Sequence, residues 1–128
     1  MNFFDEYTKA SLEKKYAEKL KNCIHFIKKC GVPIRTDVPF EFYYAFNMPL
    51  ISGMKAYPIL DGKKGRYCNG KIYIADWTME QEKRHMVKVV LHELLHEANP
   101  KDTEKTVRIK TEKYMKQITS NYYWGLSW

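Results

Sequence analysis

Two histidines and a glutamate in the second half of the chain have the residue types and spacing for metal chemistry. The apolar segment Val87–Glu97, whose residues have helical spacing, contains the pattern H-E-x-x-H. Histidines four residues apart lie one helical turn apart, with Cβ atoms about 6 Å from each other, so His92 and His96 can reach one tetrahedral zinc ion. Glu93 is then placed to accept a proton from water rather than to bind the metal. The pattern predicts metal-assisted hydrolysis.

A third ligand must come from elsewhere, because a catalytic zinc site has three protein ligands and one open position. No histidine follows His96, and the candidates are three downstream carboxylates, Asp102, Glu104 and Glu112. Helical phase favours Glu104, because Asp102 and Glu112 lie about 140° from the inward face of the last predicted helix. That face carries Val107, Thr111, Tyr114, Met115 and Ile118. We expect Glu104 as the ligand, ahead of Asp102 and then Glu112; the alternative for Glu104 is an ion pair with a Lys or Arg.

Hydrophobic periodicity predicts the elements that hold these residues. From about Phe4 to Cys30, apolar residues recur at three- and four-residue steps with lysines opposite, which indicates an amphipathic helix. Alternating apolar residues over Val38–Phe46 indicate a strand with one buried face. Two further strands are expected, one near Met54–Leu60 and a short β-branched one over Lys71–Ala75.

Local capping signals predict where the last two helices begin. Thr78 has Gln81 three residues further on, which is a capping-box pattern for the start of the helix that carries the histidines. The segment Asn99–Asp102 contains a helix stop and a restart, with Pro100 suited to the first position of the next helix. That final helix is expected to run to about Thr119.

This order of elements predicts an α+β fold: an N-terminal helix, a small three-stranded sheet, the H-E-x-x-H helix and a C-terminal helix, in one domain over residues 1–128. With the motifs G-K-I-Y-I-A-D and H-E-L-L-H, the chain resembles the zincin metallopeptidases, specifically minimal gluzincins and ImmA/IrrE-type metallopeptidases, over about Tyr67–Ile118. The interval from His96 to Glu104 is shorter than in larger gluzincins, and no DNA-binding module of the kind some relatives carry adjoins it.

The resemblance implies a zinc-dependent hydrolase that cleaves peptide bonds of a protein or peptide substrate. It implies His92 and His96 as zinc ligands and Glu93 as the general base. It also implies that the strand Lys71–Ala75 is a sheet edge that pairs with an extended substrate. Four residues are chemically suited to stabilise the developing oxyanion: Arg108, Tyr114, Tyr122 and Tyr123.

Composition places limits on location and partners. Hydrophobic residues make up 45% and charged residues 29% of the 128, as in globular proteins. No apolar run approaches membrane-spanning length and no signal peptide is evident, so we expect no membrane association. The cysteines are odd in number and lack C-x-x-C spacing, which predicts free thiols in the cytoplasm; they are Cys23, Cys30 and Cys68.

Two other functions fit part of the pattern. The net charge of +7 suits nucleic acid, and His92-x3-His96-x5-Asp102 has the spacing of the H-x3-H-x5-H endoribonucleases of rRNA maturation. That family has a third histidine, and a glycine where this chain has Glu93, so the reading is disfavoured. The second alternative function is that of a non-catalytic zincin-fold binding protein of phage or host-defence type. The intact Glu93 argues against it, because a structural metal site needs no base.

Overall fold

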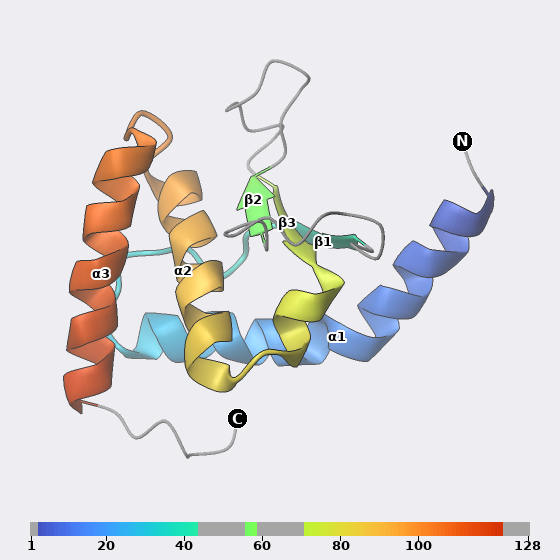
Figure 1. The fold of residues 1–128 in the computed structure, drawn as a ribbon, viewed down its shortest axis with the longest axis horizontal. Coiled ribbons are helices and arrows are strands. Elements are labelled where there is room, and N and C mark those ends of the chain that lie inside the picture. Colours follow the sequence, from blue (N-terminus) through green and yellow to red (C-terminus); the bar gives the residue numbers. More distant parts are fainter. Residues whose placement is uncertain (1–2, 44–55, 59–70, 122–128) are drawn as a thin grey trace.

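The computed structural model describes residues 3–43, 56–58 and 71–121, and Figure 1 shows the fold. The predicted α+β class is confirmed: along the chain, the strands follow an N-terminal helix and precede two C-terminal helices. In chain order the elements are α1 (Phe3–Lys29), β1 (Phe40–Tyr43), β2 (Ala56–Pro58), β3 (Ile72–Ala75), the 3-10 helix η1 (Asp76–Glu80), α2 (Lys83–Ala98) and α3 (Glu104–Asn121). Cys68, Tyr122, Tyr123 and the predicted outer ends of the first two strands lie outside the described residues.

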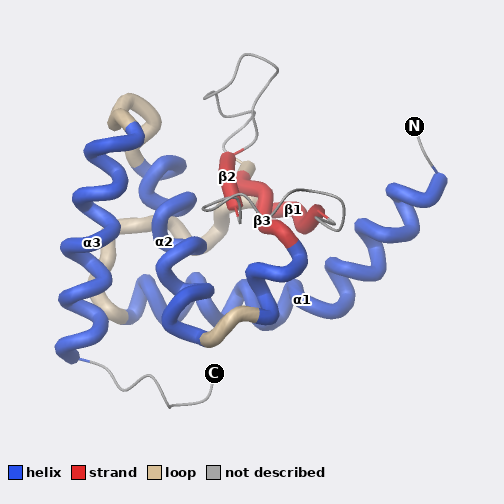
Figure 2. The backbone as a smooth tube through the Cα atoms, in the orientation of Figure 1, coloured by secondary structure: helices blue, strands red, loops and turns tan. Residues whose placement is uncertain are grey.

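The strands form one sheet in the order β1-β3-β2. β3 pairs in parallel with β1, with Phe40 opposite Ile72, and antiparallel with β2, with Pro58 opposite Ile72. The expectation that Lys71–Ala75 forms a sheet edge is therefore wrong, because β3 is the central strand (Figure 2). The central position of β3 agrees with its apolar side chains, because Ile72 and Ile74 are fully buried. Among the described residues, the edges of the sheet belong to β1 and β2.

The core lies where α1 crosses beneath the sheet and α2 (Figure 1). The inner face of α1 buries residues at the spacing predicted from the sequence, namely Tyr16, Leu20, Cys23, Ile24 and Ile27. α2 buries Val87, Val90, Leu91 and Leu94 against this layer. Each fully buried aliphatic side chain stabilises the fold by about 1.5–3 kcal/mol relative to exposure. The packing fixes the rotation of α2 and so decides which way its histidines point.

The start of α2 differs from the capping-box prediction. Thr78 is fully buried in η1, and α2 begins only at Lys83, after Glu82, which makes no side-chain capping bond. The reason is tertiary packing: Met79 is buried in the core, and the Lys19 Nζ donates a hydrogen bond to the Met79 carbonyl at 2.6 Å. These contacts hold the segment as a separate 3-10 turn instead of the first turn of α2.

The connection from α2 to α3 positions a candidate ligand. Asn99 ends α2, its N–H donating to the Leu95 carbonyl at 3.0 Å. Thr103 caps α3 by accepting a hydrogen bond from the Thr106 N–H at 3.1 Å. α3 therefore begins at Glu104, so the prediction that Pro100 is the first helical residue is wrong. At this position the helix dipole favours the carboxylate of Glu104.

An ion pair ties the segment after α1 to the end of α2. Arg35 Nη1 lies 2.9 Å from Oε2 of Glu97, whose side chain is only 6% exposed. Cys23 is a free, buried cysteine in the core, and Cys30 is buried there too. None of the helices in the described residues has the length and apolar character that a membrane crossing requires.

Replacing Arg35 by alanine is expected to lower the free energy of unfolding by about 1–3 kcal/mol, because it leaves the buried Glu97 carboxylate without a cation. Urea denaturation at neutral pH measures the change. Lys21→Ala, an exposed cation on α1, is the control and is expected to change stability by less than about 0.5 kcal/mol. Equal losses in the two variants would contradict the role of the ion pair.

Candidate metal centre

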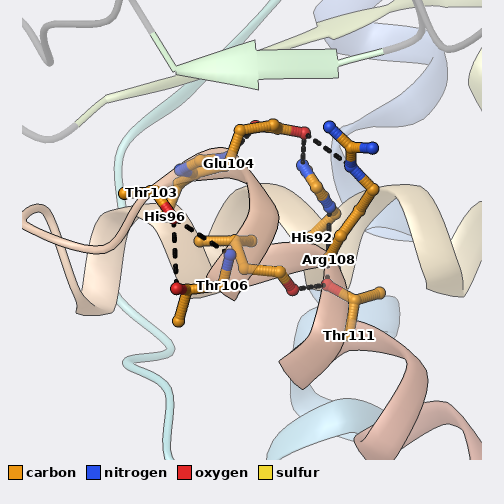
Figure 3. A network of polar contacts seen from close by, with 8 residues as sticks. His92, His96, Thr103, Glu104, Thr106, Arg108 and Thr111 are labelled. Atoms are coloured by element: carbon orange, nitrogen blue, oxygen red, sulfur yellow. Dashed lines mark hydrogen bonds and ion pairs between the residues drawn. The ribbon is translucent and has the colours of Figure 1, made fainter.

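Three side chains meet between the end of α2 and the start of α3. His92 Nε2 lies 3.0 Å from Oε2 of Glu104, and His96 Nε2 lies 2.7 Å from Oε1 of the same carboxylate. The two imidazole rings are 4.9 Å apart between centroids and stand edge to face. Figure 3 shows the Glu104 carboxylate directed at His92, with Arg108 beside it. The structure thus brings together the two histidines and the carboxylate that helical phase favours.

The hairpin of α2 and α3 produces this convergence. His92 and His96 occupy successive turns of α2, beside the buried stripe that packs on the core, so their side chains are only 19% and 15% exposed. Glu104 approaches from the first turn of α3, and its side chain is 53% exposed. The two imidazoles are therefore held by the protein interior, while the carboxylate side of the group is open to solvent.

The donor set fits a metal ion. Two imidazole nitrogens and one carboxylate oxygen from these residues all lie within 4.8 Å of one another, so the His92-His96-Glu104 group could hold a metal ion. Ligands on a tetrahedral zinc at 2.0–2.1 Å stand about 3.3 Å apart. The observed nitrogen–oxygen distances of 2.7 and 3.0 Å are slightly shorter. The exposed carboxylate needs to withdraw by roughly 0.3 to 0.6 Å, which is about one-tenth to one-fifth of the ligand spacing.

The charge states suit metal binding as well. Burial lowers the pKa of His92, outweighing the attraction of Glu104, which favours the neutral imidazole that metals require. For Glu104, burial acts to raise the pKa, but the neighbouring His92, His96 and Arg108 together hold it below its usual value. Glu104 is therefore an anion at neutral pH, facing nitrogen atoms that act as ligands when they carry no proton.

Glu93 is buried on α2 beside the first histidine. Its side chain has an oxygen, Oε1, with no hydrogen-bond partner among the described residues. Burial raises the pKa of Glu93 well above its usual value, and the negative charge of Glu104 raises it further. Glu93 directly follows the first histidine in the sequence, and when ionised its carboxylate has the chemistry of a proton acceptor.

The two other carboxylates considered as ligands are paired elsewhere. Asp102 Oδ2 lies 2.6 Å from Lys110 Nζ, and Glu112 Oε2 lies 2.7 Å from Lys88 Nζ. Neither belongs to the group that surrounds the histidines. The spacing of Asp102 relative to His96, which resembled that of an endoribonuclease, thus does not bring its carboxylate into this group.

Of the four residues considered for oxyanion stabilisation, Arg108 lies at the site. Its Nε is 3.7 Å from Oε2 of Glu104, one helical turn earlier on α3, and its side chain is 70% exposed. Tyr114 packs against the core, with Lys113 Nζ over its ring. Tyr122 and Tyr123 lie outside the described residues. Arg108 therefore contributes positive charge at the open side of the group.

Sequence reasoning placed Thr111 on the inward face of the last helix without giving it a role in the site. In the structure it is buried, and its hydroxyl lies 3.4 Å from Nδ1 of His92 (Figure 3). The signal in the sequence is its position seven residues after Glu104, which is about two helical turns. Two residues of α3 thus contact the two ring nitrogens of His92: Glu104 at Nε2 and Thr111 at Nδ1.

Comparison with known proteins gave no match: no family model matches the chain, and neither a curated protein nor a solved structure does. The chemistry of the site must therefore be inferred from its own residues.

Proposed function

We propose that the protein is a small zinc-dependent metallopeptidase that hydrolyses peptide bonds of a protein or peptide substrate. His92, His96 and Glu104 would hold the zinc ion, and Glu93 would be the general base. The observation that carries this proposal is the convergence of both Nε2 atoms on one carboxylate, with a buried glutamate next in sequence to the first histidine. We also propose a cytoplasmic location, which the buried, free thiol of Cys23 supports.

The donor set supports zinc over the harder cations. Magnesium and calcium prefer oxygen ligands, whereas two imidazoles and one carboxylate are a ligand set of catalytic zinc. Bound at these residues, zinc would supply a Lewis acid and lower the pKa of a coordinated water. The half-exposed Glu104 side of the group leaves room for water and substrate to approach.

Glu93 gives the proposal its catalytic character. In peptide hydrolysis its carboxylate would take a proton from the attacking water and pass it to the leaving amine. A structural zinc site has four protein ligands and no use for a base, whereas this group offers three candidate ligands, and Glu93 directly follows the first of them in the sequence. Arg108, at the open side, would stabilise negative charge that develops on the substrate carbonyl oxygen.

The sheet offers a route for substrate binding that differs from the one expected. Because β3 is paired on both sides, an extended peptide would pair with one of the edge strands, and β2 is the edge strand that packs against α2. Pro58 in β2 has no N–H, so this edge would provide fewer hydrogen bonds than an ordinary strand.

Metal content and cleavage together test the proposal. Mass spectrometry of the purified protein under native conditions is expected to find about one zinc per chain. The purified protein incubated with a cell-derived peptide mixture is expected to generate new peptide termini, to stop doing so with a chelator, and to recover when zinc is restored. Protein that takes up no zinc at equimolar concentration would overturn the proposal.

Two further results would overturn the enzymatic part alone. Bound zinc without cleavage of any peptide would favour a binding protein. Salt-sensitive RNA binding with metal-dependent RNA cleavage would favour a nuclease.

A further inference from the structure

We infer that Thr111 is a positioning residue for His92: its hydroxyl oxygen accepts a hydrogen bond from Nδ1–H and so directs the Nε2 lone pair toward the metal position. The inference rests on the proposed metal site and adds to it a side chain outside the H-E-x-x-H motif. The evidence for the inference is two contacts of the Thr111 hydroxyl, one with the Val107 carbonyl and one with Nδ1 of His92.

The hydroxyl of Thr111 has a single proton, and that proton has an acceptor. Thr111 Oγ1 donates to the carbonyl of Val107, one turn earlier on α3, at 2.7 Å. The same oxygen lies 3.4 Å from Nδ1 of His92. Because the proton is directed at Val107, the oxygen can only accept on the side that faces His92. The nitrogen that carries the proton when His92 binds a metal must then be Nδ1.

The opposite nitrogen of the ring is the one directed at Glu104. His92 Nε2 lies 3.0 Å from Oε2 of Glu104. A neutral imidazole with its proton on Nδ1 has its lone pair on Nε2, which is the form that binds a metal through Nε2. The threonine thus favours the tautomer that the site requires. Hydrogen bonds of this kind also fix the rotation of the ring.

The position of Thr111 gives the contact its rigidity. The side chain is buried, and threonine is branched at Cβ, so it has few rotamers available on a helix. Glu104 and Thr111 are seven residues apart on α3, about 10.5 Å along the helix axis. One helix therefore supplies both the candidate carboxylate ligand and the acceptor that orients a histidine on the neighbouring helix (Figure 3).

Zinc affinity in two variants tests the inference. Thr111→Val has nearly the same shape and lacks the hydroxyl, whereas Thr111→Ser keeps the hydroxyl and lacks the methyl group. Competition with a chromophoric chelator is expected to show affinity about tenfold weaker for Thr111→Val and close to wild type for Thr111→Ser, because loss of an outer-shell partner costs about 10–100-fold. Thr119→Val, an exposed position on the same helix, is the matched control and is expected to bind zinc as the wild type does.

A spectroscopic measurement distinguishes orientation from packing. In zinc-loaded protein, NMR is expected to show a His92 Nδ1–H proton protected from solvent exchange in the wild type and in Thr111→Ser. The protection should be lost in Thr111→Val. Thermal unfolding of the metal-free variants establishes that each one folds.

The outcomes separate the inference from the function on which it rests. Wild-type protein that fails to bind zinc would remove both. A wild type that binds zinc, with unchanged affinity and a protected Nδ1–H in Thr111→Val, would overturn only the role of Thr111. Equal loss of affinity in the valine and serine variants would also overturn it, because packing of the methyl group would then explain the effect.

Discussion

Replacing Glu93 by glutamine is expected to abolish peptide cleavage while zinc stays bound. The glutamine is nearly isosteric with glutamate, so the buried position can hold it, but its amide cannot accept the proton of the attacking water. General acid–base catalysis contributes about 10²–10⁴-fold to rate, and kcat should fall by that factor. Glu93 is not in the group formed by His92, His96 and Glu104, so metal content should be unchanged. Cleavage kinetics and metal analysis of the same preparation measure both effects.

A matched control comes from the next turn of the same helix. Glu97 is also a buried glutamate, and its Oε1 has no hydrogen-bond partner among the described residues. Its Oε2 pairs with Arg35, in the segment that follows α1. Glu97→Gln is expected to lose some stability and keep its cleavage activity. Full activity in Glu93→Gln would show that this residue is not the base. A biological effect that survives in Glu93→Gln cells, with cleavage lost in vitro, would indicate that the protein acts by binding.

Removing one of the candidate ligands is expected to have the largest effect on metal affinity. His96→Ala leaves two of the three donors, so zinc affinity should fall by more than the roughly 10–100-fold typical of an outer-shell change. Bound zinc would stabilise the folded state by an amount that grows with the logarithm of the ratio of free zinc to Kd, about 2.7 kcal/mol at a free concentration of 100 times Kd. Added zinc should therefore raise the Tm of the wild type and leave that of His96→Ala almost unchanged. Thermal unfolding with and without zinc measures the difference.

Two controls locate the effect at the site. His25→Ala removes an exposed histidine on α1, and Glu112→Gln removes an exposed carboxylate on α3 that pairs with Lys88. Both are expected to keep the zinc-dependent rise in Tm. Glu104→Ala should lose it as His96→Ala does. A zinc response that persists in both ligand variants would place the metal elsewhere on the chain.

Much of the candidate centre could be predicted from the sequence, because it depends on helix geometry. The interval from His92 to His96 puts both rings on one face, and the structure has their Nε2 atoms meeting one carboxylate. The phase of the predicted last helix favoured Glu104 over Asp102 and Glu112. In the structure Asp102 precedes α3, and both it and Glu112 pair with lysines. Periodicity is a strong signal here, since both helices bury one face against the same core.

The features that could not be predicted depend on tertiary packing. Thr78 has the local chemistry of a helix cap, but burial of Met79 holds its segment in a separate 3-10 turn. The short apolar strand β3 has the composition of either an edge or a central strand, and only the pairing of residues 56–58 distinguishes them. The contact of Thr111 with His92 joins two helices, so no local pattern contains it.

The connection between the last two helices sets the geometry of the whole centre by its length. Five residues separate Ala98, the end of α2, from Glu104, the start of α3. An inserted residue would leave Glu104 in phase with Val107 and Thr111, because the burial of those two residues fixes the rotation of α3. A deleted residue would remove up to about 3.5 Å of reach between the two helices, so the start of α3 would have to shift. The Glu104 carboxylate lies only 2.7 and 3.0 Å from the two imidazoles, and a shift of that size would separate them. A minimum loop length is thus a requirement of the centre alongside the identity of its candidate ligands.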